Sequence, residues 1–197
     1  MIIAKNGFNT GKKRMITICV ALKAELPVAP KGDFTILYTG VGKVQAATAL
    51  AKHLCHFHKP DEIWNYGTAG GLNPLVGGLN EIDIFVQRDM MAEPQAPRGS
   101  IPFSEPLIGN IKTSQSDSEI RCGTGDSFVQ GTDPWFVTAD IDCVDMEGWA
   151  LAYVAQQYNI PFRSWKYISD MADENAMKDW TANVAAGAEL FLEKFNE

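Results

Sequence analysis

Short apolar runs alternate with polar turns and helical segments along this sequence, and this alternation is its strongest constraint on the fold. Residues 15–22 (MITICVAL) are apolar without interruption, which is typical of a strand buried on both faces of a sheet. Runs at 34–39, 62–66 and 82–87 predict three further strands, and residues 121–130 resume the pattern. Strands that alternate with helices predict an α/β fold with a largely parallel or mixed sheet.

The helices are predicted from apolar spacing. From residue 43 to 58 apolar residues recur at helical intervals in an Ala-rich segment of high helix propensity. A second helix is expected to end near Tyr158, before a strand that closes at Asp170, and a final amphipathic helix is expected to begin near Lys178. Residues 135–138 are expected to form a short strand.

The region from Arg88 to Glu119 differs from the rest of the chain. It is rich in Pro, Ser and Gly and has no helical period, so we expect an irregular loop with one extended piece near residues 107–111. A loop of this length is unusual in a compact domain and is often a functional cover.

Charge and cysteine usage exclude several classes of protein. The net charge of -7 argues against a nucleic-acid or anionic-membrane surface, and no segment approaches the roughly 20 apolar residues of a membrane span. Cys19, Cys55, Cys122 and Cys143 are widely spaced, so we expect reduced thiols and a cytoplasmic protein. Residues 1–14 lack the apolar run of a signal peptide and are expected to be a flexible arm before one domain at 15–197.

Two motifs that could hold a cofactor or a metal do not fit on closer reading. The pair Gly40 and Gly42 before a helix lacks the third glycine and the acidic residue of a dinucleotide site, and no phosphate-binding Gly-Lys-Ser/Thr sequence exists. His53, Cys55, His56 and His58 fall at the end of a predicted helix, where cationic side chains meet the helix dipole. We therefore expect no cofactor and no metal.

Three carboxylates mark the sharper signal. Glu25 follows the first strand, Glu147 follows a strand expected around residues 142–145, and Asp170 closes the last strand after Ser169. Brought to one edge of a sheet, they would be costly without a polar ligand. The alternative for Asp170 is an N-cap of the next short helix. Phe128 follows a Gly-Thr-Gly turn, where a ring can stack on a flat heterocycle. The residues alone suggest a nucleotide or sugar site.

Six segments in order resemble the signatures of the nucleoside phosphorylase/nucleosidase superfamily, and are most similar to those of methylthioadenosine/S-adenosylhomocysteine nucleosidases. The segments are 21–25 (ALKAE), 39–44 (TGVGKV), 65–72 (NYGTAGGL), 125–128 (GDSF), 144–148 (VDMEG) and 168–170 (ISD). The resemblance implies a three-layer α/β/α sandwich around a mixed, partly barrel-like sheet, a homodimer, and hydrolysis of the N-glycosidic bond of an adenine nucleoside with release of the free base.

The resemblance also implies roles for single residues. Asp170 is expected to protonate the leaving purine at N7, steadied by Ser169, while Glu25 orients or deprotonates the attacking water. The substrate-binding positions are Glu147 on the ribose hydroxyls, Met146 against the sugar, Phe128 stacked on the base, Val129 reading the base edge through its backbone, and Thr68, where the family usually has Ser, beside Ala69 and Gly70. Lys166 stands where the family often has Arg.

The nucleophile decides between a hydrolase and a phosphorylase. Phosphorylases of the family hold phosphate with several Arg residues, and the corresponding glycine-rich turns here carry none. Glu25 would also repel a phosphate dianion. Water is therefore the expected acceptor. A phosphorylase that uses inorganic phosphate and a non-catalytic nucleoside-binding protein of the same fold remain the alternatives.

Overall fold

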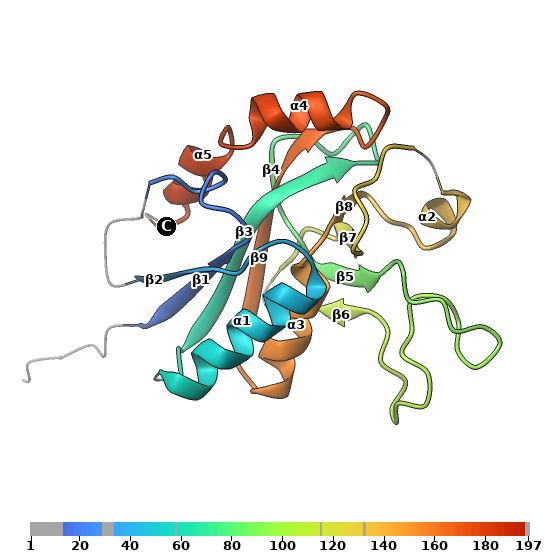
Figure 1. Cartoon of the computed structure of the whole chain (residues 1–197), viewed down its shortest axis with the longest axis horizontal. Helices are drawn as coiled ribbons and strands as arrows, with labels where there is room; N and C mark the ends of the chain where they lie inside the picture. Colours follow the sequence, from blue (N-terminus) through green and yellow to red (C-terminus); the bar gives the residue numbers. More distant parts are fainter. Residues whose placement is uncertain (1–13, 29–33, 58, 115, 132, 196–197) are drawn as a thin grey trace, which may run out of the picture.

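A computed structural model of the chain describes residues 14–28, 34–57, 59–114, 116–131 and 133–195, and shows a mixed sheet with helices on both faces (Figure 1). Its elements are β1 (Ile16–Val20), β2 (Phe34–Tyr38), α1 (Lys43–His56), β3 (Glu62–Gly71), β4 (Leu79–Glu81), β5 (Ile84–Gln87), β6 (Ile111–Lys112), β7 (Arg121–Thr124), α2 (Pro134–Thr138), β8 (Cys143–Asp145), α3 (Gly148–Gln157), β9 (Phe162–Asp170), α4 (Ala176–Asn183) and α5 (Ala188–Glu193).

The sheet branches at β3. Its strand order is β2-β1-β3-β8-β7-β5-β6, and β9 pairs with both β3 and β4. The first half of β3, up to Asn65, pairs in parallel with β1, and its end at Gly70 and Gly71 pairs antiparallel with β8. Between these points no strand in the described part of the chain pairs with this edge of β3, so the edge has a gap. The sheet is mixed, as expected, and is not closed.

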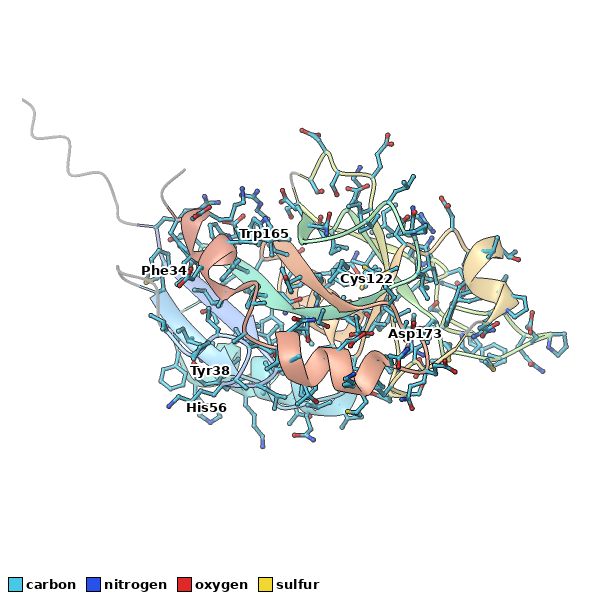
Figure 2. The ribbon with its side chains drawn as sticks, turned by 90° about the horizontal axis from the view of Figure 1, so that it is seen from above. Phe34, Tyr38, His56, Cys122, Trp165 and Asp173 are labelled. Carbon is cyan, nitrogen blue, oxygen red and sulfur yellow. The ribbon has the colours of Figure 1, made fainter. Side chains whose placement is uncertain are left out.

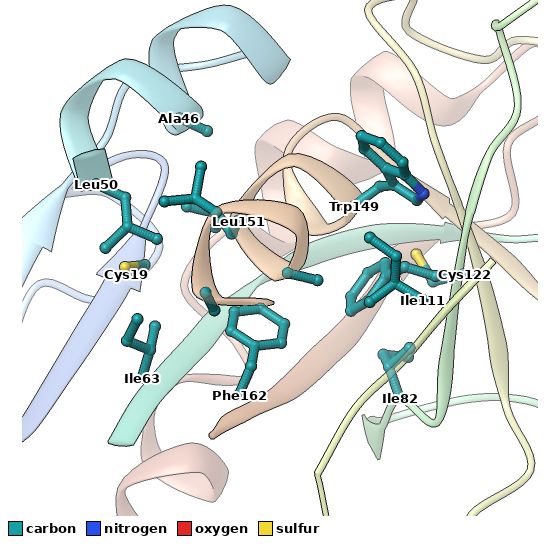
Figure 3. Close-up of a cluster of buried hydrophobic side chains, with 14 of the residues drawn as sticks. Cys19, Ala46, Leu50, Ile63, Ile82, Ile111, Cys122, Trp149, Leu151 and Phe162 are labelled. Atoms are coloured by element: carbon teal, nitrogen blue, oxygen red, sulfur yellow. The ribbon is translucent and has the colours of Figure 1, made fainter. Parts of the chain in front are cut away.

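Helices cover the two faces of the sheet with separate cores. On one face α1 and α3 lie side by side, and Leu50, Leu151 and Phe162 pack together there (Figure 3). On the other face α5 packs on aromatic residues of the sheet, where the rings of Tyr66 and Phe191 stack at 4.5 Å. Helix α4 begins close to Asp173 (Figure 2) and contacts β9. The expected α/β/α layering is confirmed.

Most predicted elements are found close to their expected bounds, and two predictions are wrong. Residues 135–138 belong to helix α2, because Asp133 caps the helix by accepting from Trp135 N and Pro134 occupies its first turn. The single C-terminal helix is two helices. Gly187, between them, lies so close to β9 that an added Cβ would sit 2.4 Å from Tyr167 Cβ.

Other segments refine the sequence analysis. The glycines expected to form a turn after β3 are part of the strand itself, and β4 was not predicted. The region after Arg88 is irregular as expected, with a bridge between Ile101 and Ile108 before the short β6. Of the expected arm at 1–14, only Arg14 is described.

The cysteines agree with the prediction of reduced, mostly buried thiols. All four are free; three are buried and Cys55 is exposed. Across the described residues, no helix is both long and apolar enough to traverse a bilayer.

Candidate active site

All ten predicted site residues line one cavity. It lies at the junction of β8 with the end of β3, two strands whose arrangement Figure 1 shows. The turn after β1 supplies one of them, β3 three, the loop after β7 two, the end of β8 two and the end of β9 two: Glu25; Thr68, Ala69 and Gly70; Phe128 and Val129; Met146 and Glu147; Ser169 and Asp170. The cavity has a volume of about 200 Å³ and is open to solvent at its mouth.

Glu25 fills the gap in the edge of β3. Its Oε1 accepts from Thr68 N at 2.8 Å and from Thr68 Oγ1 at 2.9 Å, and its Oε2 accepts from Leu22 N at 2.9 Å. The side chain is 4% exposed. The carboxylate therefore satisfies a strand N–H that no neighbouring strand reaches, and it is held rigidly at the cavity wall.

Asp170 is held at the end of β9 by two hydrogen bonds. Its Oδ2 accepts from Ser169 Oγ at 2.8 Å, and its Oδ1 accepts from Ala172 N at 2.9 Å. It does not cap α4, which begins after Asn175. The alternative interpretation as a helix cap is therefore wrong, and the carboxyl is free to face the cavity.

Glu147 lies at the start of α3 and reaches across to the turn before α1. Its Oε1 accepts from Gly42 N at 2.8 Å. Gly42 has φ 91°, a backbone conformation that favours glycine. Burial, together with the nearby charge of Asp145, raises the pKa of Glu147 to about 7, although Lys166 opposes the shift. Glu147 is thus a carboxyl that changes charge near neutral pH.

A buried ion pair between Lys166 and Asp145 lies near Glu147 and influences its charge. Lys166 Nζ lies 2.8 Å from Asp145 Oδ2, and each side chain is only 1% exposed. Asp145 also accepts from Gly148 N and Thr124 Oγ1. Burial disfavours the charged form of Asp145, but the attraction to Lys166 lowers its pKa. From the sequence, Lys166 was expected only to replace an Arg of the family, and its pairing with Asp145 was not predicted.

Replacing Lys166 by Met is expected to lower the free energy of unfolding by about 3–5 kcal/mol, because it leaves Asp145 buried without a counter-ion. Urea denaturation at pH 7 measures this loss. The double variant Lys166→Met, Asp145→Asn should regain part of it. Because the pKa of Asp145 is lowered, its contribution is present above the ordinary Asp value of 3.8 and is lost as pH falls below it.

The control is Lys178→Met, since Lys178 is exposed on α4 and its loss should change stability by only about 0.5 kcal/mol or less. A loss for Lys166→Met no larger than that of the control would contradict the structural role of the pair.

Arg88 also lines the cavity and was missed, since it lies outside the glycine-rich turns. Its guanidinium is occupied by the loop after β7: Nε donates to Gly123 O, Nη1 to Ser127 Oγ, and Nη2 to Gly125 O and Ser127 O. Burial lowers the pKa of Arg88, while Asp145 and Asp89 oppose the shift. The arginine shapes the loop that presents Phe128.

The remaining walls are largely apolar. Phe128 is 37% exposed and presents a ring on one side of the cavity. Leu22, Val41, Met177 and Trp180 also line the cavity, and the sequence had assigned none of these four to the site. A flat, partly apolar ligand with polar groups on one side fits such a lining.

The described histidines of the cluster bond groups of the fold. His53 and His56 lie in the last turn of α1, where His56 Nδ1 donates to Lys52 O and His53 Nε2 bonds Thr17 Oγ1. His58 lies outside the described residues. Within the described ranges, no group of three or more His, Cys, Asp or Glu side chains could hold a metal ion.

Comparisons with known proteins place the chain among relatives of one kind. A family model described as the phosphorylase superfamily matches residues 23–197. A 5′-methylthioadenosine/S-adenosylhomocysteine nucleosidase of Anoxybacillus flavithermus is 32% identical over 73% of this chain and 70% of its own length.

Solved structures share the fold. A Helicobacter pylori MTAN mutant with 5′-methylthioadenosine in its active site superposes with a TM-score of 0.81 at 21% identity, covering 93% of this chain and 97% of that one. The native futalosine hydrolase of Helicobacter pylori gives a TM-score of 0.81 at 22% identity, covering 93% and 96%.

Proposed function

The chain belongs to the phosphorylase superfamily, and from that premise we propose that it hydrolyses the N-glycosidic bond of an adenine nucleoside and releases the free base. One observation carries the proposal: Glu25, Glu147 and Asp170 come from the ends of three different elements and line the same cavity. Methylthioadenosine and S-adenosylhomocysteine are the first substrates to test, because they name the activity of the 32% identical relative.

The departing base is the first chemical problem. Bond cleavage passes through an oxocarbenium-like state in which negative charge collects on the purine. Asp170 protonates N7 and so neutralises the leaving base, while Ser169 Oγ, at 2.8 Å from Oδ2, fixes the direction of the carboxyl. Phe128 stacks on the base and the backbone of Val129 reads its edge.

The sugar and the water form the second part of the mechanism. Glu147 accepts the ribose hydroxyls, Met146 packs on the sugar, and Glu25 orients the attacking water and takes its proton. Thr68, Ala69 and Gly70 bring the backbone of β3 close to the reacting carbon. Carboxylates around the sugar also stabilise the positive charge that develops on it.

Water is favoured over phosphate as the acceptor. A phosphate dianion needs free cationic donors, and Arg88, which lines the cavity, directs its bonds to the loop after β7. Lys166 is paired with Asp145, and Glu25 adds a negative charge where the nucleophile would lie. The described lining therefore favours a neutral nucleophile.

The proposal is tested by measuring base release from methylthioadenosine, S-adenosylhomocysteine, adenosine, inosine and futalosine in phosphate-free buffer and again with phosphate. We expect release of adenine and a free sugar without phosphate. Release that requires phosphate would identify a phosphorylase. Tight binding without any release would identify a nucleoside-binding protein.

The raised pKa of Glu147 predicts a pH dependence. The ionised carboxyl accepts both ribose hydroxyls, so we expect kcat/KM for a ribonucleoside to rise as pH increases through about 7, the pKa of this group in the free protein. Glu147→Gln should lower kcat/KM and remove this rise. Because the folded-state pKa lies above the ordinary 4.5, the same group favours folding below pH 4.5 and loses that contribution as pH rises through 7.

A 2′-deoxynucleoside serves as the matched substrate for this test. It lacks one of the hydroxyls that Glu147 would hold, and its kcat/KM should be lower than that of the ribonucleoside and less sensitive to Glu147→Gln. Equal rates on the two substrates would contradict the role of Glu147.

We also propose that the protein is a homodimer. Large apolar side chains are exposed on the loop after β5 and on α2, including Phe103 at 88%, Val137 at 86% and Met91 at 65%. A second copy that covers them would explain their exposure. Sedimentation analysis should give twice the mass of one chain, and a single-chain mass at micromolar concentration would refute the dimer.

A further inference from the structure

Helix α4 reaches into the active-site cavity through Trp180. This half-buried side chain lines the cavity, and its indole Nε1 donates to Thr68 Oγ1 at 3.0 Å. Thr68 Oγ1 in turn donates to Glu25 Oε1 at 2.9 Å. The two residues are 112 positions apart in the sequence, so the contact exists only because α4 folds back over the end of β3.

The direction of these hydrogen bonds is fixed by chemistry. An indole N–H can only donate, and a hydroxyl has one proton and two lone pairs. Thr68 must therefore accept from Trp180, and its single proton goes to Glu25. Without the indole N–H, the hydroxyl could rotate and donate elsewhere in the cavity, and one of the three hydrogen bonds that hold Glu25 would be lost part of the time.

A second bond ties the same helix to the other reacting group. Asn183 Nδ2 donates to the main-chain oxygen of Ser169 at 2.9 Å, and the hydroxyl of the same Ser169 donates to Asp170. Within α4 only Ala176 is fully buried. The two polar bonds connect α4 to both Glu25 and Asp170 through one intervening residue each.

We propose that Trp180 is a positioning residue for Glu25. Its indole N–H fixes the Thr68 hydroxyl, and the fixed hydroxyl aims the Glu25 carboxylate at the attacking water. This inference rests on the proposed hydrolysis for its effect on rate, and it assigns Trp180 no contact with the reacting atoms.

The rate test uses Trp180→Phe, which keeps an aromatic wall and removes the N–H. We expect kcat for base release to fall about five- to tenfold, the effect of one lost hydrogen bond, while KM stays close to that of the wild type. Thr68→Val should lower kcat further, and adding Trp180→Phe to it should have no additional effect. Thr68→Ser should recover the kcat that Thr68→Val loses.

The matched control is Trp149→Phe. Trp149 Nε1 donates to Gly109 O and Trp149 does not line the cavity, so this variant loses the same kind of bond elsewhere. It should keep the wild-type kcat at 25 °C. A rise in KM with unchanged kcat for Trp180→Phe would show that Trp180 is only a wall of the pocket and would overturn the inference.

A spectroscopic arm tests the same bonds without any substrate. The indole N–H resonance of Trp180 should shift in Thr68→Val, and also in Glu25→Gln, because the bonds are coupled through one hydroxyl. Glu174→Gln, an exposed change, should leave it in place. An unshifted resonance in both site variants overturns the inference, whereas a wild-type protein without base release overturns the proposed function alone.

Discussion

Replacing Asp170 by Asn is expected to lower kcat for adenine release by about 10³-fold, within the range of roughly 10² to 10⁴ that a positioned general acid contributes. The amide has the shape of the carboxyl and its oxygen can still accept from Ala172 N. It cannot deliver a proton to the purine. Nucleoside binding should persist, because the stacking ring and the ribose carboxylate are untouched, and titration calorimetry of the inactive variant measures it.

Asp173→Asn is the matched control. Asp173 is exposed three positions further on and accepts from Asn175 N, so the same substitution there should leave kcat and thermal stability unchanged. Turnover by Asp170→Asn at the rate of this control would contradict the acid role, and loss of both binding and folding in Asp170→Asn would mean that the residue is structural.

The residues that line the cavity could be predicted from the sequence, and the reason is physical. Each predicted carboxylate follows an apolar run, and a sheet brings the ends of such runs together. The resemblance of six segments in order to a known family added site residues, such as Met146 and Val129, that spacing alone did not indicate. Phe128 was found because a ring beside a glycine turn is exposed in a predictable place.

Other parts of the site could not be predicted because they depend on contacts between distant residues. The pair of Lys166 with Asp145 joins β9 to the end of β8, which are not neighbouring strands in the sheet. Trp180 meets Thr68 across 112 positions of the chain, because α4 lies over the end of β3. Gly187, between α4 and α5, has no side chain and so lets the chain pack closely on Tyr167, and no helical period reveals such a contact.

The error at α2 has a local cause. Trp135, Phe136 and Val137 have strand propensity, and the strand was predicted without regard to the capping signal of Asp133 and Pro134. The capping bond from Trp135 N to Asp133 Oδ1, at 2.9 Å, decided the helix. In so short a segment, one cap has more influence than propensity.

Replacing Glu25 by Gln is expected to lower kcat by about 10²-fold or more, because the water loses the group that aligns it and takes its proton. Among the described residues, the partners of the Glu25 carboxylate are all donors: Thr68 N, Thr68 Oγ1 and Leu22 N. Gln offers one acceptor oxygen and one NH₂ group, so whichever way the amide turns, a donor faces a donor. Positioning is therefore damaged together with basicity.

Stopped assays of adenine release by Glu25→Gln, with Glu174→Gln as an exposed control, measure this effect. The same variant also separates the two nucleophiles. A hydrolase loses its base and slows in every buffer, whereas a phosphorylase loses a negative charge that repels its phosphate and becomes faster when phosphate is added. Acceleration of Glu25→Gln by phosphate would contradict water as the acceptor, and a rate equal to that of the control would remove Glu25 from the mechanism altogether.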